Sequence, residues 1–123
     1  MNTSQLLGRR VALRISDPWE FGTECGGGPF FGHLLDFGNK KILGVDVERA
    51  LVGLDPPIKY QGASYSAARC DVRHEGTSFY DLNTESRIPV NITLLPAKVT
   101  TFSDVDNHLF RRGFLATGSL QFA

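Results

Sequence analysis

The sequence predicts a mainly β protein, a small barrel of five to seven short strands with one short helix near the C-terminus. Two observations predict this class. Glycine and phenylalanine are frequent, at 13 and 9 of 123 residues, whereas the residues that favour exposed helices are sparse. Short segments of alternating apolar and polar residues also recur at intervals of about 8–12 residues, separated by Gly/Pro turn residues. Leu, Ile, Val and Phe make up about 29% of the chain, enough to build a core.

The predicted strands follow from a period of two in the apolar residues. In residues 8–15, Val11, Leu13 and Ile15 alternate with less apolar neighbours, as in a half-buried strand. Val90, Ile92 and Leu94 alternate in the same way with polar residues. The full set of predicted strands is 8–15, 29–37, 42–47, 50–54, 58–60, 64–72, 90–94 and 114–122, with 99–102 as an extension of the seventh.

Turn residues set the predicted limits of these strands. Residues 16–28 contain Asp17-Pro18 and three consecutive glycines, which predicts a long loop. Gly38-Asn39 predicts a tight turn with Lys40-Lys41 at its tip. Two consecutive prolines cannot donate to a sheet ladder, so Asp55-Pro56-Pro57 is expected to interrupt the sheet. The remaining predicted turns are Gln61-Gly62 and His74-Glu75-Gly76.

One segment has the features of a helix. Ser103 can cap residues 104–112, and Gly113 can end the helix. Acidic residues occupy its first turn and arginines its last, which complements the helix dipole.

The predicted order of elements, a long loop after the first strand and then a meander, is similar to that of small SH3-like barrels. The similarity concerns architecture only, because the sequence has no SH3 motif such as an Ala-Leu-Tyr-Asp-Tyr stretch, and a shared fold does not carry function. Without a repeat or a linker, residues 1–123 are expected to form one domain.

The net charge is zero, with 13 basic and 13 acidic residues, but the charges are unevenly distributed. Residues 1–15 contain three arginines and no acid, whereas residues 16–39 contain four acids and no base. Residues 40–123 are nearly balanced. Proteins that bind nucleic acid through bulk electrostatics are usually basic, so the composition disfavours that class.

The acidic segment also contains the single tryptophan of the chain. An acidic loop with an aromatic anchor is a suitable surface for a partner protein with a basic surface. The alternative is that Trp19 and Phe21 fold back as a lid over the open end of the core, and the sequence leaves both interpretations open. The candidate binding residues in this segment are Asp17, Trp19, Glu20, Phe21 and Glu24.

A second group of candidate binding residues, Arg73, His74 and Glu75, lies in a polar turn. Nearby basic and aromatic residues, Lys59 and Arg69 with Tyr60 and Tyr65, alternate in a pattern found in small barrels that bind single-stranded nucleic acid. Asp71 and Glu75 interrupt the basic pattern, so this function is kept as an alternative.

Catalysis and metal binding have weaker support. Cys25, before three glycines, is a candidate nucleophile of a small hydrolase with His33 or His74 as base, but no protease motif surrounds it. Cys70 and His74 are four residues apart, and the other potential ligands have no close neighbour, so no metal site is predicted. No catalytic residue and no cofactor are therefore assigned.

The predicted function is a non-enzymatic protein-binding module, such as an inhibitor or immunity-type protein, in a bacterial-type cytoplasm. The apolar runs are too short to span a membrane, and the order of charges at the N-terminus does not match a signal peptide. The two cysteines are expected to be free thiols. The predicted partner is a protein with a basic surface, and neither nucleic acid nor a membrane is expected.

Overall fold

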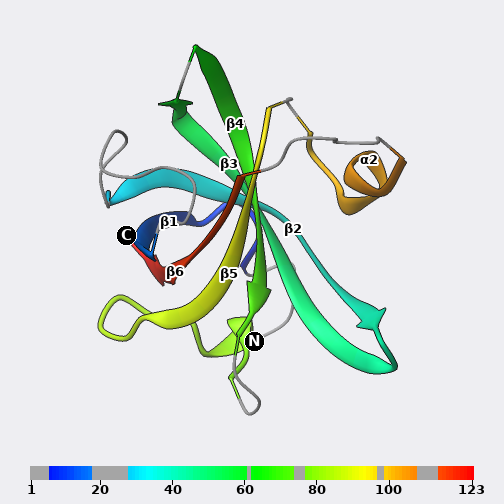
Figure 1. The fold of residues 1–123 in the computed structure, drawn as a ribbon. Helices are drawn as coiled ribbons and strands as arrows, with labels where there is room; N and C mark the ends of the chain where they lie inside the picture. The colour runs from blue at the N-terminus through cyan, green and yellow to red at the C-terminus, as the bar shows by residue number, and fades with distance from the viewer. Residues whose placement is uncertain (1–5, 18–27, 61, 74–76, 97–98, 108–113) are drawn as a thin grey trace.

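The structure is a computed structural model that describes residues 6–17, 28–60, 62–73, 77–96, 99–107 and 114–123. It confirms the predicted small β-barrel. Six antiparallel strands follow one another around the barrel, and the first pairs with the last to close it (Figure 1). The strands are β1 (Arg10–Asp17), β2 (Phe30–Ile42), β3 (Val45–Tyr60), β4 (Ala63–Val72), β5 (Ile88–Leu95) and β6 (Phe114–Phe122).

The barrel interior is filled by the apolar residues that the period of two selects. On β1, Val11 and Leu13 are completely buried, and Ile15 is nearly so. Val90, Ile92 and Leu94 of β5 are also completely buried, while Asn91 between them is exposed. Together with apolar residues from the other strands they form one continuous core. Alternation therefore identified the inward face of these strands before any pairing was known.

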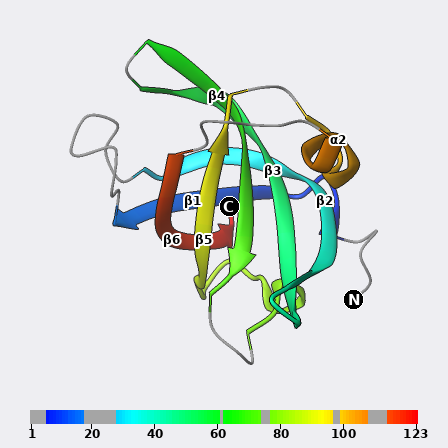
Figure 2. The same cartoon turned by 45° about the vertical axis from the view of Figure 1, so that its right-hand side comes forward.

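A second, smaller core lies outside the barrel. Helix α2 (Phe102–Asn107) packs beside β2 and β3 (Figure 2). This cluster comprises Leu51, Ala67, Leu95, Val99, Phe102 and Val105, with Leu35 against it. The expectation that residues 99–102 extend β5 is therefore wrong, because Val99 and Phe102 cover the outer face of the sheet instead. The helix begins at Phe102, so Ser103 lies inside it, and residues 108–113 of the predicted helix are outside the described residues.

The β2–β3 hairpin is longer than the sequence predicted. Gly38 and Asn39 do not form a turn, because they pair with Arg49 and Glu48 within the ladder. The turn lies at Leu43-Gly44, where both residues have positive φ, 52° and 81°. This is the geometry of a two-residue type I′ hairpin turn. The predicted strand 42–47 is consequently divided by this turn, since Ile42 ends β2, and its residues from Val45 onward form a single strand, β3, with the predicted strand 50–54.

β3 also continues through its two prolines. The pairing of β3 with β4 lapses between Gly53 and Ile58 and then resumes at a shifted register. The prolines interrupt the ladder, as expected, but the chain keeps its direction, so the element does not end there. Of the predicted Gln61-Gly62 turn, Gln61 lies outside the described residues; Gly62 has positive φ, 79°, and Tyr60 pairs with Ala63.

A 3-10 turn, η1 (Phe79–Asp81), closes one end of the barrel. Phe79 is completely buried in the main core. Ser78 caps the turn by accepting a hydrogen bond from the backbone N–H of Tyr80 at 3.2 Å. With about three residues per turn, consecutive residues of a 3-10 helix point in different directions, so Tyr80 faces solvent while Phe79 is buried.

Candidate functional site

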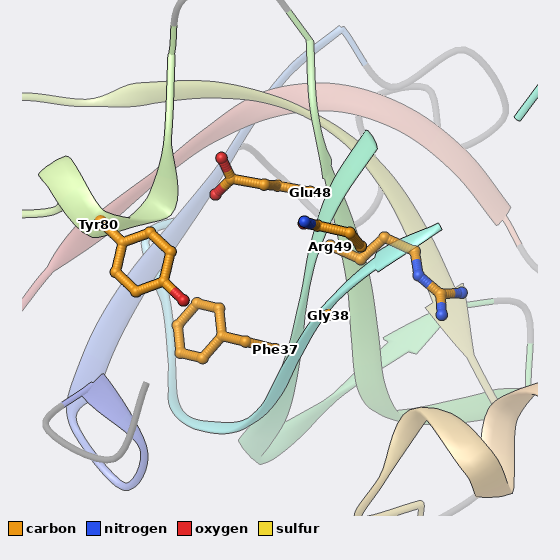
Figure 3. A pocket seen from close by; sticks show the side chains of 6 residues that line it. Phe37, Gly38, Glu48, Arg49 and Tyr80 are labelled. Carbon is orange, nitrogen blue, oxygen red and sulfur yellow. The ribbon is translucent and has the colours of Figure 1, made fainter. Parts of the chain in front are cut away.

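A pocket of about 160 Å³ lies where the β2–β3 hairpin meets η1 (Figure 3). It is lined by residues from three segments that are distant in the sequence. The lining residues are Phe37, Gly38, Asn39, Glu48, Arg49 and Tyr80.

One wall of the pocket is aromatic. The rings of Phe37 and Tyr80 lie side by side, with centroids 6.4 Å apart and planes 18° from parallel (Figure 3). Phe37 also contacts the buried Phe79, at 6.0 Å and a tilt of 54°. Since Phe79 is fixed in the core, Phe37 is held from behind, while Tyr80 is 44% exposed. The wall is thus rigid on its inner side and accessible on its outer side.

Glu48 supplies the acidic group of the pocket. Its Oε1 accepts two hydrogen bonds from the η1 segment, from the Ser78 hydroxyl at 3.0 Å and the Phe79 backbone N–H at 3.1 Å. These bonds fix the carboxylate in place, and within the described residues Oε2 accepts none. A carboxylate held through one oxygen keeps its second oxygen as an acceptor for a ligand.

Asn39 stands directly opposite Glu48, because the two residues are register partners on β2 and β3. Side chains of such pairs lie on the same face of the sheet with Cβ atoms about 4.5–5.5 Å apart. The pocket therefore has two oxygen-bearing side chains next to each other, one on each strand.

Arg49 is one of the lining residues, but its charged group is directed away from the pocket. Its guanidinium points away from Phe37 and Tyr80 (Figure 3) and stacks on the ring of Phe102, 4.2 Å from the centroid. Arg49 is only 5% exposed. Adjacent residues of a strand face opposite sides of the sheet, so Glu48 faces the pocket and Arg49 faces the outer core. Glu48 is accordingly the only charged group, among the described lining residues, that is directed into the pocket.

Asp36 links the pocket to helix α2. Its Oδ1 accepts from the backbone N–H of Phe37 at 2.9 Å, and its Oδ2 accepts from that of Phe102 at 2.8 Å. One carboxylate therefore holds both the aromatic wall and the first residue of α2. Asp36, one of the four acids of residues 16–39, therefore stabilises the fold through these two hydrogen bonds.

Two of the sequence-predicted site residues lie within the described residues. Asp17 belongs to β1, where its backbone pairs with Thr117 after a register shift, and not to the predicted loop. Arg73 is exposed just after β4, and its backbone N–H donates to the carbonyl of Pro89 at 3.2 Å. The predicted site residues outside the described residues are Trp19, Glu20, Phe21, Glu24, His74 and Glu75.

The side chains of Tyr60 and His74, part of the basic and aromatic set predicted near the β3–β4 hairpin, lie outside the described residues, and the others are arranged as follows. Tyr65 is only 4% exposed and belongs to the main core. Arg69 forms an ion pair with Asp71, at 3.3 Å. Lys59 and Arg73 are exposed. The buried ring of Tyr65 cannot stack on a nucleobase in this fold.

Cys70 is a buried free thiol. Burial is the largest cause that raises its pKa above the ordinary value of 9.0; the nearby Asp71 carboxylate raises it further and Arg69 lowers it. A thiol held neutral in this way is a poor nucleophile. Cys25, the candidate nucleophile of the sequence, lies outside the described residues. Within the described part of the chain, no group of three or more metal-binding side chains occurs.

The sequence did not identify Phe37, Glu48 or Tyr80 as site residues. They come from β2, β3 and η1, and no local motif connects them. The sequence offers one signal, the two adjacent aromatic residues Phe79 and Tyr80. Only the burial of Phe79 in the core shows that the ring of Tyr80 is left exposed.

Comparison of the chain with models of protein families, with curated proteins and with solved structures found no match. No helix in the described residues has the length and apolar character needed to cross a membrane.

Proposed function

We propose that this protein is a non-enzymatic protein-binding module whose partner presents a basic surface. The observation that carries the proposal is the pocket between Phe37, Tyr80 and Glu48, which combines a fixed carboxylate with an accessible aromatic wall. Both features attract a cation, the first through charge and the second through the electron-rich ring face.

The size of the pocket supports a macromolecular partner. Sites for small molecules usually measure about 300–1,000 Å³, whereas this pocket measures about 160 Å³. It has room for one large side chain. A partner protein that inserts a single basic side chain satisfies this limit, and the surrounding surface then supplies the rest of an interface.

The chemistry of the pocket favours binding over catalysis. General acid–base chemistry commonly needs two titratable groups with different environments. Among the described lining residues, Glu48 is the only carboxylate, and it is engaged by Ser78 and Phe79; the other titratable side chain that lines the pocket is the phenol of Tyr80.

The charge distribution also favours a basic partner. The last three residues of the acidic 16–39 segment, Phe37 to Asn39, line the pocket. We therefore include the acidic, Trp-bearing loop of the sequence in the proposal as a second contact for the partner. The setting that we propose is the cytoplasm, and the proposed class is an inhibitor or immunity-type protein. Complementary charge would speed association and make it sensitive to salt.

The proposal is tested by capture of partners from native lysate on four immobilised forms: wild type, Glu48→Gln, the triple variant Trp19/Glu20/Glu24→Ala and the control Glu85→Gln. Glu85 is an exposed acid whose backbone N–H donates to Asn83. We expect the wild type and Glu85→Gln to retain the same basic protein at low salt. Glu48→Gln and the triple variant should lose it while their thermal midpoints stay near that of the wild type. Equal capture by all four forms would contradict the proposal.

A further inference from the structure

We propose that the pocket selects arginine over lysine, with the guanidinium stacked on Tyr80 and donating hydrogen bonds to Glu48 and Asn39. This inference rests on the proposed function and specifies the side chain that the partner inserts.

The shape of the aromatic wall favours a flat cation. The rings of Phe37 and Tyr80 are only 18° from parallel, and the outer ring, Tyr80, is 44% exposed. A guanidinium is planar and weakly hydrated, so it can lie flat on such a ring, whereas an ammonium is compact and strongly hydrated. Stacking therefore gives arginine an advantage that lysine does not have.

The acceptors of the pocket match a forked donor. Glu48 and Asn39 are cross-strand partners, which places two side chains with acceptor oxygens on one face about 5 Å apart at Cβ. Glu48 Oε1 is already engaged by Ser78 and Phe79, so each side chain has one oxygen to offer. A guanidinium has five N–H donors in a fixed plane and can reach both oxygens while it remains stacked.

The same kind of contact, an arginine stacked on an aromatic ring, already occurs within this chain. Three of its arginines lie over phenylalanine rings at 4.1–4.5 Å, namely Arg9 over Phe122, Arg10 over Phe31 and Arg49 over Phe102. These contacts give the distance at which an incoming guanidinium would lie above Tyr80. Arg49 cannot fill the pocket itself, because its guanidinium is held on the other face of β3.

The inference is tested by titrating the protein with three blocked tripeptides, Ac-Gly-Arg-Gly-NH2, Ac-Gly-Lys-Gly-NH2 and Ac-Gly-citrulline-Gly-NH2, followed by NMR chemical shifts. Citrulline has almost the shape of arginine but no charge. We expect millimolar binding of the arginine peptide, at least about five-fold weaker binding of the lysine peptide, and none of the citrulline peptide.

The three peptides distinguish a failure of the arginine selectivity from a failure of the proposed function. Equal binding of the arginine and lysine peptides would overturn the selectivity while leaving a pocket for basic side chains. Binding of the citrulline peptide as strong as that of arginine, or binding of none of the three, would contradict both.

Two variants of Tyr80 test the stacking contact. Tyr80→Ala should weaken binding of the arginine peptide about five-fold, since a cation–π contact at an exposed site contributes roughly that factor. Tyr80→Phe keeps the ring and should retain more of the affinity than Tyr80→Ala. Because Tyr80 lies on the surface, the NMR spectrum of each variant should show an intact barrel. Unchanged arginine binding by Tyr80→Ala would overturn the inference.

Discussion

Replacement of Gly118 by alanine is expected to open the seam that closes the barrel. Gly118 lies on β6, where it pairs with Ile15 of β1 on one side and with Val90 of β5 on the other. A Cβ at this position would lie 1.8 Å from the backbone carbonyl oxygen of Arg14 and 3.0 Å from Ile92 Cδ1. The first contact is with backbone, so a change of rotamer cannot relieve it.

The expected loss of stability can be estimated from the distance that the backbone must move to relieve this contact. A Cβ needs more than 3 Å from a carbonyl oxygen, so β1 and β6 must separate by more than 1 Å where they pair. Overpacking of a close-packed interior costs about 1–3 kcal/mol, and displacement of backbone belongs at the upper end. We therefore expect about 3 kcal/mol of destabilisation, which lowers the thermal midpoint by about 12 °C at roughly 4 °C per kcal/mol.

The matched control is Gly38→Ala. Gly38 is also a strand glycine, but a Cβ there would meet only Phe102 Cδ2, at 3.7 Å, an ordinary contact. Its stability should change by no more than about 0.5 kcal/mol. Both variants are measured by thermal and urea unfolding followed by circular dichroism. If Gly118→Ala unfolds at the same temperature as Gly38→Ala, the described β1–β6 pairing is wrong.

Three further predictions concern the hairpin turn, the buried thiol and the helix contact. Leu43 is completely exposed at φ 52°, so Leu43→Asn should stabilise the protein by about 1 kcal/mol in urea unfolding, because asparagine tolerates this conformation; a loss of stability would exclude the type I′ turn. Cys70 should resist iodoacetamide at pH 8 in the native state and react in urea, and because burial raises its folded-state pKa, its contribution to stability should fall as the pH rises above 9.0; native labelling at the unfolded rate would contradict this. Asp36→Ala removes the acceptor of the Phe37 and Phe102 N–H groups, so it should cost about 1–3 kcal/mol and speed hydrogen exchange at Phe102; unchanged exchange would show that the carboxylate does not hold α2.

Much of the barrel could be predicted because its strands carry their own pattern. The buried residues of β1 and β5 alternate with polar or less apolar ones, and this local property identifies both strands and their inward faces. The β2–β3 turn could not be located in this way. Gly38-Asn39 has the residue types of a turn, yet the ladder continues through it, and the turn falls at Leu43, a residue type that rarely adopts positive φ.

The candidate site could not be predicted for a different reason. Phe37 and Glu48 meet only because the hairpin is longer than its turn residues indicated, and Tyr80 reaches them only because Phe79 closes the barrel end. Such a site depends on contacts between distant segments, which propensity and periodicity do not encode. The uneven charge of residues 16–39 is readable in the sequence, but it predicts only the sign of charge that a partner would carry, and it gives no indication of where the pocket lies.

The most direct test of the central claim is a chemical-shift map of the protein with Ac-Gly-Arg-Gly-NH2, recorded at low salt for the wild type, Glu48→Gln and Glu85→Gln. We predict that the largest shifts fall on Phe37 to Asn39, on Glu48 and Arg49, and on Tyr80, the residues that line the pocket. The shifts should be retained in Glu85→Gln and largely lost in Glu48→Gln. Shifts that fall outside these residues, or that persist in Glu48→Gln, would contradict the claim that the pocket receives a basic side chain.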